Sequence, residues 1–137
     1  MTAVDTNVLV RLLTRDDPNQ YQSALALFEK HEVHVPDTVW LETEWVLRYA
    51  YGYDRSDIVK AFRGLLGLPQ VRVADAIRLL LAIEWHANGL DLADALHLAA
   101  CQDMDTLATF DRSFVRRAAN LGRCRVLDPV AIVAEKA

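Results

Sequence analysis

The sequence predicts an α/β fold, in which a short, mostly parallel central sheet of four to five strands is covered by helices on both faces. Short runs of β-branched and other apolar residues recur along the chain, and longer segments with helical periodicity separate them. Helix caps and chain breakers mark the boundaries between the two kinds of segment. A length of 137 residues suits a single domain, residues 1–137, with one hydrophobic core.

Five short segments are candidates for the strands of this sheet. They are residues 2–4, 33–35, 71–73, 106–109 and 125–127. The second of these segments is closed by Pro36. Ligands of parallel α/β folds bind at the carboxyl ends of the strands, so we expect the chemistry of this protein at that edge of the sheet.

Helical patterns fill the segments between the strands. They cover residues 7–14, 17–31, 37–51, 54–66, 75–88, 91–104 and 112–121, and a last one starts at residue 128. Asp17 followed by Pro18 is typical of a helix start, with a capping side chain and a proline in the first turn. Either Asp37 or Thr38 can cap the next helix.

The charge balance is mildly acidic, with 15 Lys and Arg residues against 19 Asp and Glu residues, a net charge of −4. The protein therefore lacks the basic character of a nonspecific nucleic-acid binder, although acidic metal ligands can offset basic residues elsewhere. The first ten residues contain no basic region, and no segment has the roughly 18 apolar residues of a membrane span. Cys101 and Cys124 indicate no disulfide framework. We expect a cytoplasmic protein without a membrane partner.

Several carboxylates occupy the positions where an α/β fold places its chemistry. Asp5 directly follows the first strand, and Asp111 follows the fourth strand after one intervening residue. Asp91 and Asp94 are three residues apart on a helix, so their side chains share one face. Taken singly, each acid has a simpler explanation. Asp5, Asp91 and Asp111 can be helix N-caps, and Asp94 can complement the helix dipole.

The central helix carries two further acids, Glu42 and Glu44, among large hydrophobic residues. The large hydrophobic residues around Glu42 are expected to be mostly buried, and a carboxylate among them needs a partner, because an unpaired buried charge is costly. One of the two glutamates is expected to be a solvated surface residue. Trp40 and Trp45 of the same helix are expected to pack in the core.

Carboxylates that converge on one pocket raise each other's pKa unless a cation neutralises them. An oxygen ligand set without paired sulfur or imidazole suits a hard ion, Mg²⁺ or Mn²⁺. Such an ion can orient a water molecule and stabilise charge on a phosphodiester. The expected ligand set therefore fits this chemistry.

Four motifs in order resemble the PIN-domain family, and most closely its VapC-type toxins. They are VDTNVLV at residues 4–10, the helix in which Glu42 precedes a tryptophan-containing EWVLR segment, GLDLADALHLAA at residues 89–100, and TFD at residues 109–111. The resemblance covers essentially the whole chain. It implies a three-layer α/β/α fold and an Mg²⁺- or Mn²⁺-dependent endoribonuclease.

By this resemblance, Asp5, Glu42, Asp94 and Asp111 match the four acids of the family's active site. Glu42 is preferred over Glu44 because its distance from Pro36 keeps the family's spacing. The resemblance implies that Asp5, Asp94 and Asp111 ligate the ion, and that Glu42 ligates it or orients the attacking water.

The resemblance also implies supporting residues. Thr6 and Asn7 match polar positions of the first motif, Thr109 matches a hydroxyl found before the fourth acid, and Asp91 resembles an accessory acid. The implied partners are an RNA substrate, a small cognate antitoxin and a second copy of the chain in a homodimer. Tyr51 is a candidate for contact with the antitoxin, together with Tyr53.

Arg112, Arg116 and Arg117 are candidates for a basic rim that meets RNA, or they form an ordinary solvated helix face. A catalytically silent PIN-fold binding module, which acts only through a protein partner, is the alternative function. A phosphotransfer domain of the haloacid-dehalogenase kind is disfavoured, because such enzymes need an Asp where this chain has Asn7.

Overall fold

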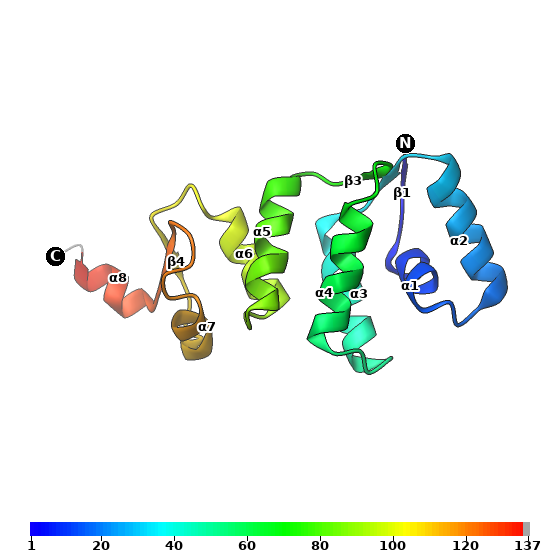
Figure 1. Ribbon diagram of the computed structural model, residues 1–137. Coiled ribbons are helices and arrows are strands. Elements are labelled where there is room, and N and C mark those ends of the chain that lie inside the picture. Colours follow the sequence, from blue (N-terminus) through cyan, green and yellow to red (C-terminus); the bar gives the residue numbers. More distant parts are fainter. Residues whose placement is uncertain (136–137) are drawn as a thin grey trace. The chain divides into compact units, whose positions relative to one another are not determined.

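One or two helices follow each of five strands, which gives eight helices in residues 1–135, the part of the chain that the computed structural model describes. Figure 1 shows the course of the chain through these elements. Every strand pair is parallel, so the predicted α/β class with parallel strands is confirmed. The chain divides into two compact units, Met1–Ala76 and a second unit that begins at Ile77. Within residues 1–135, no helix combines the length and apolar character that a membrane span requires.

The first unit contains a three-stranded sheet in the order β1-β2-β3. Its strands are β1 (Thr2–Ala3), β2 (Val33–His34) and β3 (Val71–Arg72). Its helices are α1 (Thr6–Thr14), α2 (Pro18–Lys30), α3 (Asp37–Tyr49) and α4 (Arg55–Leu66). All three strands coincide with predicted strand segments. Because they run in parallel, their carboxyl ends lie at one edge, and α1 and α3 begin just beyond that edge.

Capping side chains start the helices of this unit largely as predicted. The Asp17 carboxylate accepts a hydrogen bond from the Gln20 backbone N–H at 3.1 Å, and Pro18 occupies the first turn. The predicted cap of α3 is wrong, because Asp37 is already helical and Pro36 takes the cap position without a side-chain hydrogen bond. Asp37 instead places a negative charge in the first turn, where the helix dipole favours it.

The core of the first unit is built around α3 and α4. Trp40 is fully buried and meets Phe62 edge to face, with ring centroids 5.1 Å apart. The prediction that Trp45 packs in the core is wrong, because its side chain is 56% exposed and contacts Tyr49. Five residues separate the two tryptophans, which turns Trp45 roughly 140° away from Trp40 around the helix.

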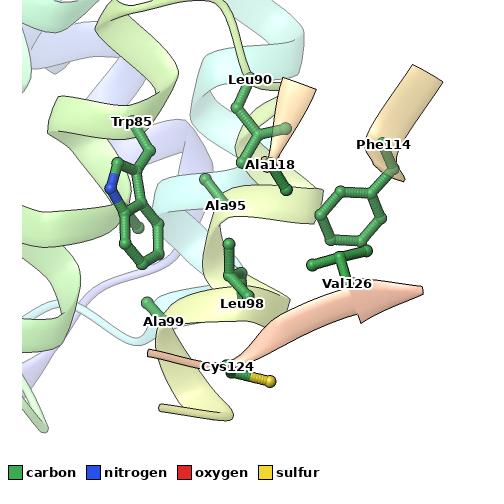
Figure 2. Close-up of a cluster of buried hydrophobic side chains, with 10 residues drawn as sticks. Trp85, Leu90, Ala95, Leu98, Ala99, Phe114, Ala118, Cys124 and Val126 are labelled. Carbon is green, nitrogen blue, oxygen red and sulfur yellow. The ribbon is translucent and has the colours of Figure 1, made fainter. Parts of the chain in front are cut away.

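The second unit contains a two-stranded parallel sheet, β4 (Thr106–Ala108) and β5 (Arg125–Leu127). Its helices are α5 (Ala76–Ala87), α6 (Leu92–Ala100), α7 (Arg112–Arg117) and α8 (Pro129–Glu135). Figure 2 shows its core, in which Leu98 and Ala95 of α6 lie between Trp85 of α5 and Phe114 of α7. Cys124 joins this core as a free thiol.

Two helices of the second unit end earlier than predicted. α6 stops at Ala100, because Gln102 folds back to bond Leu98 O at 3.0 Å and Arg123 N at 2.7 Å. α7 stops at Arg117, because the chain turns through two left-handed positions, Asn120 and Gly122, both at φ 66°.

Gly122 offers a test of this turn. We expect Gly122→Ala to destabilise the protein by about 2 kcal/mol, since a side chain is strained at positive φ and a Cβ would clash with Gln102. The matched control is Gly64→Ala inside α4, where a Cβ meets no atom within 4 Å; we expect it to stabilise by about 0.5–1 kcal/mol. Urea unfolding of both variants measures the difference, and a neutral Gly122→Ala would contradict the expectation.

Candidate active site

Asp5 lies where β1 ends and α1 begins. Val4 N still bonds His34 O at 3.1 Å, continuing the sheet, and the next residue caps the helix. Oδ1 of Asp5 accepts a hydrogen bond from Thr6 N at 2.7 Å, whereas its Oδ2 has no hydrogen-bond donor among residues 1–135. Asp5 therefore lies at the end of β1 and also caps α1, and capping occupies only one of its carboxylate oxygens.

Glu42 of α3 meets α1 at Thr6. The hydroxyl of Thr6, a buried residue, donates a hydrogen bond to Glu42 Oε1, although 36 residues separate the two in sequence. Asp5, Thr6, Asn7 and Glu42 line one cavity of about 430 Å³ in the first unit. The expectation that one of the two glutamates is solvated is confirmed, and it is Glu42, whose side chain is exposed at this cavity.

Glu44 is the buried glutamate of α3. Its side chain is 1% exposed, and Arg48, one turn later on α3, binds both carboxylate oxygens at 2.7 and 3.1 Å. The two-residue offset from Glu42 to Glu44 turns the side chain about 200° around the helix. Glu42 therefore belongs to the cavity, and Glu44 belongs to the packing of α3.

The second unit carries its own group of acids. Asp91 caps α6, accepting from Ala93 N at 3.1 Å and Asp94 N at 3.4 Å. Asp111 caps α7 through a hydrogen bond from Phe114 N at 3.1 Å. The hydroxyl of Thr109, which follows β4, accepts from Asp111 N at 3.0 Å and holds this loop in place. The N-cap explanations for Asp91 and Asp111 are confirmed, and Oδ2 of Asp111 has no hydrogen-bond donor among residues 1–135.

Asp94 lies in the first turn of α6 and is half-buried. Burial raises the pKa of Asp94, and the negative charges of Asp91 and Asp111 raise it further, while His97 acts in the opposite direction. Asp94 therefore lies close enough to Asp91 and to Asp111 to be repelled by both. A cation at this position would relieve that repulsion.

We expect Asp94→Asn to raise the unfolding temperature of the metal-free protein at neutral pH, because the substitution removes a desolvated charge next to two like charges. A raised carboxyl pKa stabilises the fold below the unfolded pKa, and this contribution is lost as pH rises through the folded pKa. The advantage of the variant should therefore be absent below the ordinary aspartate pKa of 3.8 and appear as the pH rises toward neutrality. Circular-dichroism melts in EDTA measure it.

Asp91→Asn is the matched control, since asparagine also caps a helix and removes one charge from the same group. We expect a smaller rise, because Asp91 is more exposed than Asp94. An Asp94→Asn protein that melts at or below the temperature of the unmodified chain at pH 7 would contradict the expectation.

The predicted acids thus form two groups, Asp5 with Glu42 in the first unit and Asp94 with Asp111 in the second. Within residues 1–135, no three His, Cys, Asp or Glu side chains are grouped so that they could hold a metal ion. The donor chemistry nevertheless fits a hard divalent cation, because every donor is a carboxylate oxygen and Asp5 and Asp111 each keep one oxygen without a donor.

The predicted basic residues differ in their hydrogen-bond partners. Arg117 bonds Ser113 at 3.2 Å and Gly89 O at 3.2 Å, which ties α7 to the loop before α6. Arg112 and Arg116 are exposed, and no side-chain hydrogen bond or ion pair engages them within residues 1–135. The sequence reasoning missed a basic residue of the first unit, Arg11, which lines the same cavity as Asp5 and Glu42.

Comparison with known proteins indicates which family the sequence resembles. A family model described as PIN domain matches residues 2–120, a span that contains all four acids. No curated protein matches the chain in sequence.

Proposed function

Because the chain belongs to the PIN-domain family, whose members generally are nucleases, we propose that it is a metal-dependent endoribonuclease. We propose Mg²⁺ or Mn²⁺ as the ion, residues 1–137 as one nuclease domain, and a cytoplasmic role as the toxin of a VapBC-type toxin–antitoxin pair. The ion is proposed because the donors are carboxylate oxygens, and the cytoplasmic setting because Cys101 and Cys124 are free thiols.

The observation that carries this proposal is the meeting of Asp5 and Glu42 beside Thr6 in one cavity. Two carboxylates from different helices gather there, and neither is paired with a basic side chain among residues 1–135. A structural role alone would favour ion pairs of the kind that Glu44 makes with Arg48. We propose a catalytic role for Asp94 and Asp111 of the second unit as well.

In the proposed reaction, a water oxygen attacks the phosphorus of an RNA phosphodiester, and the bond from phosphorus to the 3′ oxygen breaks. The products carry a 5′-phosphate and a 3′-hydroxyl, and the leaving oxygen takes up a proton. Asp5, Asp94 and Asp111 are each proposed as a ligand of a divalent cation, which would supply charge stabilisation at the phosphate and would acidify the attacking water.

Glu42 is proposed to orient the attacking water, because its Oε1 is fixed by the Thr6 hydroxyl while Oε2 accepts no hydrogen bond from residues 1–135. Thr6 thus holds a catalytic carboxylate in position, and Thr109 does the same for the backbone of Asp111. We propose Asp91 as an accessory acid, and Arg112 with Arg116 as part of the rim that meets RNA.

The direct test incubates purified protein with single-stranded and structured RNAs in Mg²⁺, Mn²⁺ or EDTA. Internal cleavage with either ion, abolished by EDTA, is the expected result, and end-labelling should find a 5′-phosphate. Cleavage that persists in EDTA rules out the proposed mechanism. An absence of cleavage with both ions favours the silent binding module instead.

The proposed partners are a small antitoxin and a second copy of the chain. Trp45 and Tyr49, 56% and 64% exposed, form an apolar surface on α3 that suits a protein contact. Light scattering of the purified chain tests the homodimer, and co-expression with the product of a neighbouring reading frame tests the antitoxin.

A further inference from the structure

Arg11 places a positive charge in the wall of the acidic cavity. The cavity that Asp5 and Glu42 line in the first unit is also lined by Arg11 of α1 and by Tyr51, which follows α3. Asn7 and Arg11 are one helical turn apart, so both side chains lie on the face of α1 that borders the cavity. An arginine next to carboxylates suggests a role toward an anionic ligand, since RNA phosphates would otherwise meet only negative charge there.

The guanidinium of Arg11 is held from three directions. Its Nε donates to Gln20 Oε1 at 2.7 Å, and its Nη1 donates to Asp16 Oδ1 at 3.2 Å and to the Tyr51 hydroxyl at 3.1 Å. Tyr51 in turn donates to Asp16 Oδ2 at 2.6 Å, and the Thr14 hydroxyl donates to Asp16 Oδ1 at 2.9 Å. These contacts order a side chain that otherwise has many rotamers, which lowers the entropy cost of binding a ligand.

One nitrogen of Arg11 has no hydrogen-bond acceptor in this network. Nε and Nη1 have acceptors, whereas Nη2 has none within residues 1–135. Arg11 therefore lines the cavity and ties α1 to its neighbours while keeping one pair of N–H donors unused in the described part of the chain. Two free N–H groups on a fixed cation match the non-bridging oxygens of a phosphate.

We propose that Arg11 is a positioning residue that binds, through Nη2, a non-bridging oxygen of an RNA phosphate next to the one that is cleaved. This inference rests on the proposed function, since it assigns a substrate contact at the same cavity. Asp16, Gln20 and Tyr51 fix the guanidinium in place. The positive charge offsets the repulsion between the substrate backbone and the carboxylates of Asp5 and Glu42.

Binding of a fluorescent single-stranded RNA, measured by anisotropy in EDTA over a range of salt concentrations, tests the proposal without cleavage. We expect Arg11→Gln to weaken binding about tenfold. The slope of log K against log salt should fall by about 0.7, the value for one lost contact to a single-strand phosphate. Arg11→Lys should keep the slope, because the charge remains. Loss of a merely structural contact would leave the slope unchanged.

Arg55→Gln is the matched control, since Arg55 is an exposed arginine of the same unit outside the cavity, and its loss changes the net charge equally. We expect it to bind RNA like the unmodified chain. Tyr51→Phe should weaken binding with an unchanged slope, because it loosens the guanidinium without removing its charge. Melting curves check that each variant folds. If Arg11→Gln is unfolded, Arg11→Lys and Tyr51→Phe decide the result.

An Arg11→Gln slope equal to that of the unmodified protein, or an equal effect in Arg55→Gln, overturns the proposal. A chain that binds no RNA also overturns it. The proposed function is tested separately by cleavage with Mg²⁺. Arg11-dependent binding without cleavage removes the nuclease assignment and keeps the RNA contact, whereas cleavage without a slope change removes the contact alone.

Discussion

Asp5→Asn is expected to lower Mg²⁺-dependent RNA cleavage by about a thousandfold, which corresponds to about 4 kcal/mol of lost transition-state stabilisation. The amide keeps the shape of the side chain and can still accept the hydrogen bond from Thr6 N that caps α1. It loses the negative charge that a divalent cation needs. Initial rates with a labelled RNA under saturating Mg²⁺ measure the effect, and a melting curve shows that the fold is kept.

Asp17→Asn provides a matched control for this prediction. Asp17 also caps a helix of the first unit, α2, through a backbone hydrogen bond at 3.1 Å, and it lies outside the cavity of Asp5 and Glu42. We expect its cleavage rate to stay within about twofold of the unmodified chain, since no transition-state contact is lost. If both variants are equally active, Asp5 has no part in the reaction.

Arg48→Met is expected to destabilise the protein by about 3 kcal/mol, the low end of what breaking a buried ion pair costs. Glu44 is 1% exposed and accepts hydrogen bonds from Arg48 at both carboxylate oxygens, so the substitution leaves an unpaired charge in the interior. The low end applies because the Arg48 side chain is itself 37% exposed, which lets water screen part of the interaction. Urea unfolding at neutral pH measures the free energy of unfolding.

The double variant Glu44→Met with Arg48→Met distinguishes the contribution of charge to stability from the contribution of packing. With both charges removed and the volume largely kept, we expect most of the lost stability to return. Glu44→Met alone should cost less than Arg48→Met, because the charge left behind on Arg48 can reach solvent. A double variant as unstable as Arg48→Met would show that the shape of the arginine matters and its charge does not.

The strands and most helix starts were predictable because they depend on local chemistry. An aspartate before a helical pattern caps it wherever the helix packs, as Asp17, Asp91 and Asp111 do. The parallel strands were equally local, since short β-branched runs between helices have few other arrangements. Caps and candidate ligands could not be told apart in sequence, and the structure shows that capping leaves one carboxylate oxygen of Asp5 and one of Asp111 without a hydrogen-bond donor among residues 1–135.

Burial along α3 was harder to predict. Apolar residues occur on every side of α3, and the acids lie between its two tryptophans, in the order Trp40, Glu42, Glu44 and Trp45. No periodicity therefore selects the buried face. The partners of α3 select it: Phe62 packs against Trp40, and Thr6 binds Glu42. Such contacts join residues distant in sequence, so a single sequence could not reveal them.

Arg11 illustrates the same limit at the candidate site. In sequence it is one basic residue inside an apolar helix, with a partner in Gln20 that looks like an ordinary surface residue. Its place beside the carboxylates depends on Tyr51, which is 40 residues away. The basic residues after Asp111 are clustered in sequence, which made them candidates for RNA contact. Such clustering gives no information about the residues that an isolated arginine contacts in the fold.

The double use of Asp5 and Asp111, as helix caps and as proposed ligands, has an evolutionary consequence. At either position a change to asparagine would remove a proposed ligand while leaving a well-folded chain, since the amide caps a helix as well as the acid does. Under the proposed function, a toxin gene inactivated in this way would still produce a decoy that competes for the same antitoxin. Loss of activity and loss of the protein would then be separate events in the history of such a gene pair.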